Sequence, residues 1–172
     1  MEELGMRVSA ALDALLEDPG RSTWDTKRWT DHVKSAVVGL AREAGQRAYA
    51  SGDCGAYGRE WLYDLSWLDY SPGEKRLSRT VLVMESEWAW DKRERDRDFL
   101  KLLVARADLR VMVFPAQDAA KWQSTVDWFV DLIQACQQSQ PGDRYLFAGW
   151  RTDIKRFQHR HYVHASPASP PP

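Results

Sequence analysis

The chain has 172 residues, of which 44% are hydrophobic and 28% charged, which is the size and composition of one soluble globular domain with its own core. A formal net charge of −1 argues against binding nucleic acid through the overall charge of the protein, so such binding would depend on a local basic patch. Cys54 and Cys136 are too few and too far apart for a disulfide framework, and no secretory segment or apolar run of membrane-spanning length is visible, which predicts a cytoplasmic protein outside the membrane.

Two helices are expected at the beginning of the chain. Apolar residues recur at helical spacing over residues 3–17, and again over about 25–50 in a stripe from Trp29 to Ala48. A glycine-rich segment then breaks the second helix. Two strand-like runs follow, at about 59–70 and 79–90, and the turn chemistry between them predicts a hairpin.

The second half of the chain alternates helices and strands. The expected elements are a helix at about 91–107, a short buried strand at 108–114 that ends at Pro115, an amphipathic helix at about 118–138, a strand at 144–150 and an edge strand at 157–164. This order predicts a single α/β domain over residues 1–165, in which a helix crossover makes the 109–114 strand parallel to its neighbour. The proline-rich tail, 166–172, is expected to be disordered.

Acidic side chains lie inside the two strand-like runs. Glu85 and Glu87 are two residues apart, so they point to the same side of the second strand, and Asp64 lies within the first. Burial and like charge both raise carboxyl pKa values, so such a group needs a cationic partner. These acids therefore predict a divalent-metal site, and the alternative is a solvated face of an antiparallel hairpin.

A helix, a hairpin with Asp64 and then Glu85-x-Glu87, and a further helix and strand resemble the core of the PD-(D/E)XK nuclease superfamily over roughly residues 25–114. The resemblance implies a restriction-endonuclease-like α/β fold with a mixed central sheet flanked by helices. It also implies that Asp64 is the motif aspartate and Glu85 the acid of the third motif. Glu87 stands where the family usually has lysine, and Lys101 on the following helix is similarly placed to a lysine that some members recruit. Glu43 resembles an auxiliary acid of some members, although a solvated glutamate is the alternative.

The expected chemistry is hydrolysis of phosphodiester bonds in nucleic acid. Asp64 and Glu85 offer hard oxygen ligands for Mg²⁺ or Mn²⁺, which keeps positions open for water and phosphate and activates the attacking water. Lys101 would stabilise charge in the transition state, unless it is a solvated helix residue. The sequence therefore predicts a metal-dependent nuclease, with Asp64, Glu85, Glu87 and Lys101 as its catalytic residues.

A basic segment near the end of the chain is the best candidate for contacts with phosphate. Four cations, Arg151, Lys155, Arg156 and Arg160, face a single acid in this segment. A solvated edge strand explains them equally well. Nucleic acid is accordingly the expected partner, and a homodimer is a further option. Nine tryptophans are unusual, and core packing is favoured for them over a surface for stacking bases or a partner interface.

Two other functions remain open at this point. One is a catalytically inactive restriction-endonuclease-like module that serves as a protein- or nucleic-acid-binding scaffold, which Glu87 in place of lysine would suit. The other is a small-ligand binder whose acids hydrogen-bond a cationic group. The sequence contains no Gly-rich phosphate loop, no His-Glu-x-x-His and no Gly-x-Ser-x-Gly, so motors, zinc proteases and serine hydrolases have no support.

Overall fold

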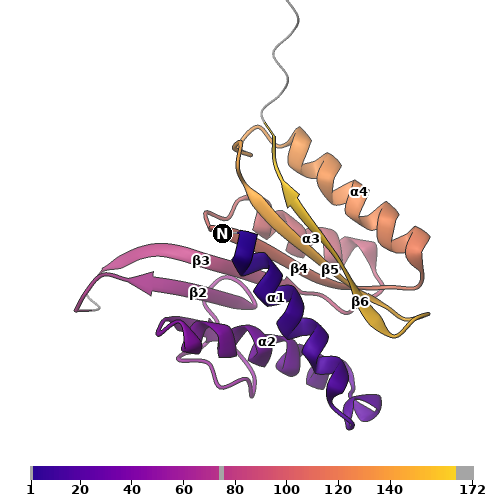
Figure 1. The fold of residues 1–172 in the computed structure, drawn as a ribbon. Helices are drawn as coiled ribbons and strands as arrows, with labels where there is room; N and C mark the ends of the chain where they lie inside the picture. The colour runs from indigo at the N-terminus through magenta and orange to yellow at the C-terminus, as the bar shows by residue number, and fades with distance from the viewer. Residues whose placement is uncertain (1, 74–75, 166–172) are drawn as a thin grey trace, which may run out of the picture.

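The computed structural model describes residues 2–73 and 76–165 and has an α/β fold, a six-stranded mixed open sheet flanked by helices (Figure 1). The helices are α1 Glu2–Ala14, α2 Thr26–Glu43, α3 Lys92–Leu103 and α4 Ala119–Ala135, with short 3-10 turns at Leu15–Glu17 and Arg21–Thr23. The strands are β1 Arg47–Ala50, β2 Leu65–Tyr70, β3 Leu77–Ser86, β4 Leu109–Ala116, β5 Arg144–Arg151 and β6 Arg156–Val163. The predicted disordered tail, 166–172, lies outside the described residues.

The strands lie in the sheet in the order of the sequence. β1, β2 and β3 form an antiparallel meander, β3, β4 and β5 run parallel, and β6 closes the far edge antiparallel to β5. The predicted crossover through α3 makes β4 parallel to β3, as expected. Figure 1 shows β2 and β3 projecting as a long hairpin away from the end of the sheet that carries α4.

Helices cover both faces of the sheet, so the protein has two hydrophobic clusters. On one face, Val37 of α2 packs in a cluster with Leu82 and Val111 of the sheet. On the other, Phe99 of α3 stacks on Phe129 of α4 at 4.1 Å between ring centroids. Side chains of successive strand residues therefore point alternately into one cluster and into the other. A polar side chain at the end of a strand lies at the boundary between the two clusters.

The second predicted helix is shorter than expected, because strand β1 occupies residues 47–50. The helix ends at Glu43, and Gly45 follows it at φ +68. Its N–H donates to the Arg42 carbonyl, and the N–H of Gln46 donates to the Ala41 carbonyl at 2.9 Å. Such a glycine in the left-handed region stops a helix, whereas the alanines beyond it continued the apolar spacing and misled the prediction.

The ends of three strands also differ from the prediction. Residues 59–64 form a loop, in which Leu62 has φ 126, and β2 begins only at Leu65. At the other end of the hairpin, β3 stops at Ser86. β4 continues through Pro115, which is tolerated because β3 no longer pairs with β4 beyond Val113, so the missing N–H of proline breaks no bond there.

Candidate functional site

Asp64 lies directly before β2, and Glu85 is the second-last residue of β3. The register joins Leu65 to Met84 and Ser66 to Val83, so Asp64 and Glu85 are the next positions along the hairpin, just beyond the last recorded pair. They lie on the face that Val83 shares with α3. A carboxylate oxygen of Asp64 accepts the backbone N–H of Ser86 at 2.8 Å, which holds the acid against the end of β3.

Glu85 is a buried acid whose negative charge is only partly compensated by neighbouring cations. The residue is 1% exposed. Burial, and then the negative charge of Asp64, raise its pKa to about 8, against the opposing charge of Lys101. Lys101 Nζ lies 3.3 Å from Glu85 Oε1, yet among the described residues no donor reaches this oxygen in hydrogen-bonding geometry. Without a further cation, Glu85 is therefore protonated at neutral pH.

Lys101 reaches this acid from α3, the helix that follows β3. It contacts both oxygens of Glu85 at 3.3 Å and also pairs with Asp98, one helical turn earlier, at 2.8 Å. Burial lowers the pKa of Lys101, but the hydrogen bond to Asp98 and the charge of Glu85 raise it to about 12. The structure thus brings Lys101 together with Glu85 as a permanent ammonium group, and it adds Asp98, which the sequence did not single out.

A second lysine, Lys34, enters the site from the opposite face of the sheet. It lies on α2, is 3% exposed, and approaches Asp64 at 3.5 Å and Glu60 at 3.7 Å. Its ammonium group also donates to the Ser51 hydroxyl at 3.3 Å. Lys34 was not among the predicted site residues, although one signal was present: it lies one turn before Val38 in the apolar stripe of α2, where a solvated lysine is not expected.

The pKa of Asp64 reflects these contacts. Burial raises it, while the charge of Lys34 and the Ser86 N–H lower it, and the balance leaves the pKa above its ordinary value. The carboxylate of Asp64 is therefore held in place, but its negative charge is not fully compensated. A second positive charge near Asp64 and Glu85 would favour the ionised form of both acids.

Glu87 lies beyond the end of β3 and is only partly buried. It accepts the Ala89 N–H at 2.6 Å. Burial raises its pKa, and the neighbouring Asp98 carboxyl raises it further. Glu87 therefore extends the acidic cluster along α3, next to the Asp98 that binds Lys101.

The remaining predicted site residues lie apart from this cluster. Glu43 pairs with Arg7 of α1 at 3.0 Å, in the last turn of α2 and about two and a half turns beyond Lys34. In the basic segment, Arg151 pairs with Asp153 at 2.6 Å and Arg160 with Asp127 at 3.2 Å. Within residues 2–73 and 76–165, no acid pairs with Lys155 of the β5–β6 turn or with Arg156 at the start of β6, and both cations are exposed. This turn follows β5, which lies two strands from β3 and ends at the same end of the sheet.

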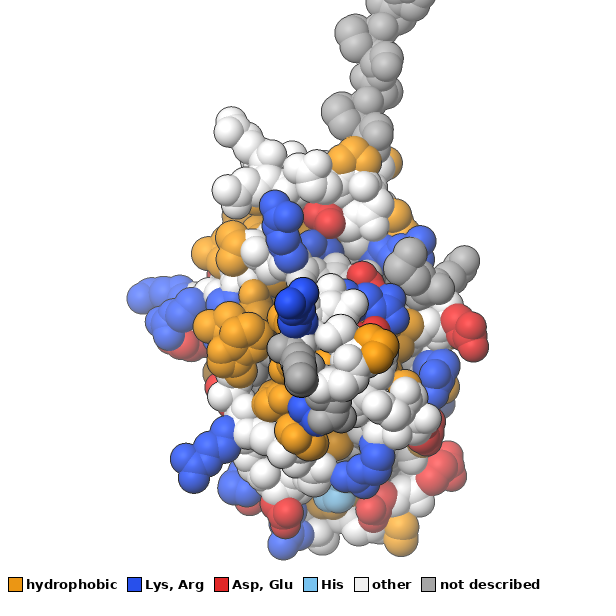
Figure 2. Space-filling model, turned by 90° about the vertical axis from the view of Figure 1, so that its left-hand side faces the viewer, with side chains coloured by type: hydrophobic (Ala, Val, Ile, Leu, Met, Phe, Trp, Pro, Cys, Tyr) orange, Lys and Arg blue, Asp and Glu red, His pale blue; other side chains and the backbone are white. Residues whose placement is uncertain are grey.

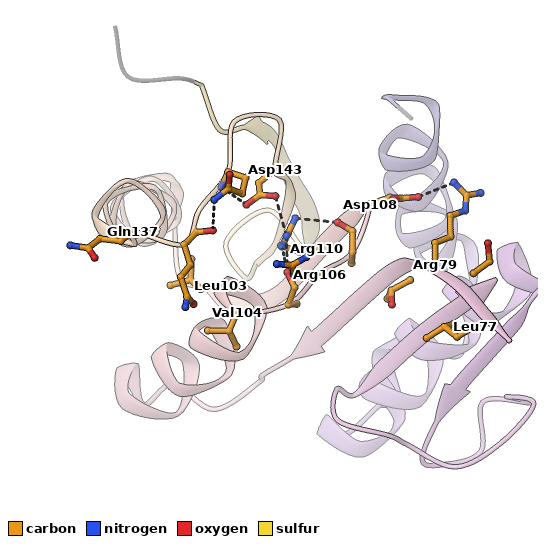
Figure 3. A pocket seen from close by; sticks show the side chains of 15 residues that line it. Leu77, Arg79, Leu103, Val104, Arg106, Asp108, Arg110, Gln137 and Asp143 are labelled. Atoms are coloured by element: carbon orange, nitrogen blue, oxygen red, sulfur yellow. Dashed lines mark hydrogen bonds and ion pairs between the residues drawn. The ribbon is translucent and has the colours of Figure 1, made fainter. Parts of the chain in front are cut away.

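A large cleft of about 1010 Å³ lies at the opposite end of the parallel strands, where these strands begin (Figure 3). It is formed by the start of β3, the α3–β4 loop and the α4–β5 loop. Two of its arginines have acidic partners: Arg79 pairs with Asp69 and Asp108, and the buried Arg110 pairs with Asp143 at 3.1 Å. A third arginine of the lining, Arg106, is exposed.

The donor set at Asp64 and Glu85 fits a hard divalent cation bound in an open site. In the part of the chain that the structure describes, no group of three or more acid, histidine or cysteine side chains is arranged to hold a metal. Mg²⁺ does not need such a cage, since it typically binds one or two carboxylates together with waters and phosphate oxygens. The buried Glu85 oxygen without a donor is the group that a cation would satisfy.

The comparisons with known proteins leave this site to be interpreted from its geometry. Among the described residues, no helix has both the length and the apolar character required to cross a membrane. A scan against models of protein families found no match, and searches among curated proteins and among solved structures found none either.

Proposed function

We propose that this protein is a divalent-metal-dependent nuclease with a restriction-endonuclease-like core. The observation that carries the proposal is the pair of acids at the end of the β2–β3 hairpin, Asp64 and the buried Glu85, with Lys101 of the next helix 3.3 Å from Glu85. Supporting it further, the antiparallel meander β1–β2–β3, the crossover through α3 and the parallel strand β4 follow the order expected for that core.

Each residue has a distinct task in the proposed reaction. Asp64 and Glu85 would bind Mg²⁺ or Mn²⁺, and Glu85 would release its proton as the cation binds. The bound cation would polarise the phosphodiester and lower the pKa of a water ligand. Lys101, already protonated, would stabilise negative charge on the phosphate in the transition state. Lys34 would hold Asp64 in place from the far side of the sheet.

The departure at Glu87 is compatible with this scheme. The position that usually supplies lysine from the strand carries an acid here, and the ammonium group comes from α3 instead. Asp98 sets the direction of Lys101 through the 2.8 Å ion pair. Glu87 and Asp98 would then tune the charge of Lys101 rather than bind the metal.

The test is a titration with Mg²⁺ and Mn²⁺, followed by thermal melting and by cleavage of labelled nucleic acid. We expect the cations to raise the melting temperature of the wild type, and Asp64→Asn and Glu85→Gln to lose both this shift and the cleavage. Asp131→Asn, an exposed aspartate on α4, is the matched control and should behave as the wild type. Equal shifts in all four proteins would mean that the cation binds elsewhere and would refute the proposal.

One observation favours a second candidate, a catalytically inactive module that binds protein or nucleic acid. Each acid already has an ammonium group nearby, Lys34 at 3.5 Å from Asp64 and Lys101 at 3.3 Å from Glu85. Lysines of this kind can take the place of a metal in a purely structural ion cluster. A wild type that shows neither a metal-induced shift nor cleavage would support this module over the nuclease.

A further inference from the structure

An aromatic groove of about 490 Å³ lies between β1, the β2–β3 hairpin and the loop that precedes β2. Its walls are Tyr49 of β1, Leu68 and Tyr70 of β2, Leu77 at the start of β3, and Arg59, Glu60 and Trp61 of the β1–β2 loop. Its volume is in the range of ligand pockets, about 300–1,000 Å³, and its lining is mainly apolar and aromatic, with one cation and one acid. We call these seven residues the aromatic groove.

The aromatic groove lies on the same face of the sheet as Glu85. The register pairs Tyr49 with Ser66, and Ser66 with Val83, so Tyr49 points to the side of the sheet on which Val83 and Glu85 lie. The helices on this side, α3 and α4, pack against β3, β4 and β5. The β1–β2 end of this face is bordered by the loop that carries Trp61.

Aromatic rings of this region are open to solvent. Trp61 is 52% exposed and Tyr57, next to the groove, is 62% exposed. The guanidinium of Arg47 lies 4.2 Å from the centre of the Tyr57 ring and 5.4 Å from that of Tyr70. Exposed aromatic surface bordered by cations marks a binding surface more often than a packing defect.

One lining residue of the groove, Glu60, connects it with the proposed metal ligand Asp64 through Lys34. Glu60 lines it and accepts a hydrogen bond from the Ser51 hydroxyl at 2.6 Å. Glu60 also lies 3.7 Å from Lys34, which in turn approaches Asp64 at 3.5 Å. Figure 2 views the molecule from the side to which the β2–β3 hairpin projects and shows hydrophobic side chains at the surface with Lys and Arg side chains beside them.

We propose that the aromatic groove binds the bases of a single-stranded nucleic acid, which makes single strands the substrate class; this inference rests on the proposed nuclease function. Sequence-tolerant binding of single strands uses aromatic side chains on which bases stack, together with cations that contact the backbone. Trp61 supplies an exposed ring face and Tyr70 a half-buried one, and Arg59 supplies positive charge that is complementary to phosphate. Bases in a duplex are already stacked on each other, so they offer no free face to these rings.

The inference is tested by fluorescence anisotropy with a short labelled oligothymidylate, in EDTA so that no cleavage occurs. We expect the wild type to bind this strand more tightly than a duplex of the same length. Trp61→Ala should weaken the binding of the single strand about five- to a hundredfold, the range for loss of one stacking residue, and Trp61→Phe should retain most of it. Arg59→Ala should reduce the dependence of binding on salt.

The matched control is Trp128→Ala on α4. Trp128 is 40% exposed and lies outside the groove, where Lys92 contacts its ring at 4.0 Å. This variant should bind the oligothymidylate as the wild type does, and melting curves should show that both tryptophan variants fold. Equal affinity for single strand and duplex, or equal binding by Trp61→Ala and Trp128→Ala, would overturn the inference. Displacement of the strand by an equal concentration of free thymidine monophosphate would overturn it as well.

The two proposals fail separately. If Trp61 contributes to binding but neither metal binding nor cleavage occurs, the groove stands as a single-strand binding site and the nuclease proposal fails. If the acids bind metal and the protein cleaves, but Trp61→Ala binds like the control, only the groove proposal fails.

Discussion

Replacing Glu85 with glutamine should remove a pH-dependent loss of stability. Burial and the charge of Asp64 raise the pKa of Glu85 to about 8 in the folded protein, whereas a glutamate in the unfolded chain titrates near ~4.3. Because the folded-state pKa is the higher one, protonated Glu85 stabilises the fold. This stabilisation is complete below the unfolded pKa and is lost as the pH rises through about 8.

The size of the effect follows from the two pKa values. Between about pH 6 and pH 9 the unfolded chain keeps Glu85 ionised, whereas the folded protein must change from mostly protonated to mostly ionised. Integrating this difference in bound protons gives a loss of about 3 kcal/mol in the free energy of unfolding. The pKa of Lys101 is about 12, so Lys101 keeps its charge throughout this range.

Urea unfolding at the two pH values, in EDTA, measures this difference. From the lower to the higher pH, the wild type should lose about 3 kcal/mol relative to Glu85→Gln, because the other titrating groups are common to both proteins. Glu43→Gln makes the same chemical change at a side chain that is 67% exposed, and it should follow the wild type. Identical pH dependence in the wild type and Glu85→Gln would refute the assignment of Glu85 as a buried, protonated acid.

Three further substitutions test separate parts of the structure. Lys101→Ala should slow cleavage on the order of a hundredfold while changing nucleic-acid affinity far less, measured by single-turnover cleavage and anisotropy; a rate equal to that of the wild type would remove Lys101 from the mechanism. Lys34→Met should lower the free energy of unfolding by about 1–3 kcal/mol, which is less than for a fully buried pair because the Asp64 side chain is 25% exposed. Urea melts should show a smaller loss at acid pH, where Asp64 is neutral. Gly149→Ala should cost about 1–3 kcal/mol, because its new methyl group would lie 2.2 Å from the Trp122 ring, and an unchanged melting temperature would show that Trp122 moves freely.

The elements that could be predicted from the sequence are those with strong local signals. The alternation around Glu85 placed it and Asp64 within a hairpin, and the apolar spacing after residue 98 placed Lys101 on the helix that follows. Both signals depend on the periods of strands and helices, which act over a few residues. The mixed α/β sheet flanked by helices follows from the order of these elements.

The parts that could not be predicted depend on contacts distant in sequence. Lys34 belongs to the site because α2 packs across β2, and a lysine on a helix is solvated in most proteins. Trp61 and Tyr70 line the same groove because the loop 59–64, in which Leu62 has φ 126, returns the chain to β2. Strand β1 was hidden because Ala44 and Ala48 continue the helical spacing from Leu40, and Gly45 alone marked the boundary.

The two lysines link the site to both hydrophobic clusters, because each lysine pairs one acid of the site with the helix on one face of the sheet. Lys34 reaches Asp64 from α2, on one face of the sheet, and Lys101 reaches Glu85 from α3, on the other. The backbone N–H of Ser86, the residue after Glu85, donates a hydrogen bond to the Asp64 carboxylate, and this bond holds Asp64 next to Glu85 at the strand ends. A change in either cluster that shifts its helix would therefore move one ammonium group away from its acid while the other stays in place. Because each acid responds to its own lysine, packing changes on the α2 side should alter Asp64 first, and those on the α3 side should alter Glu85 first.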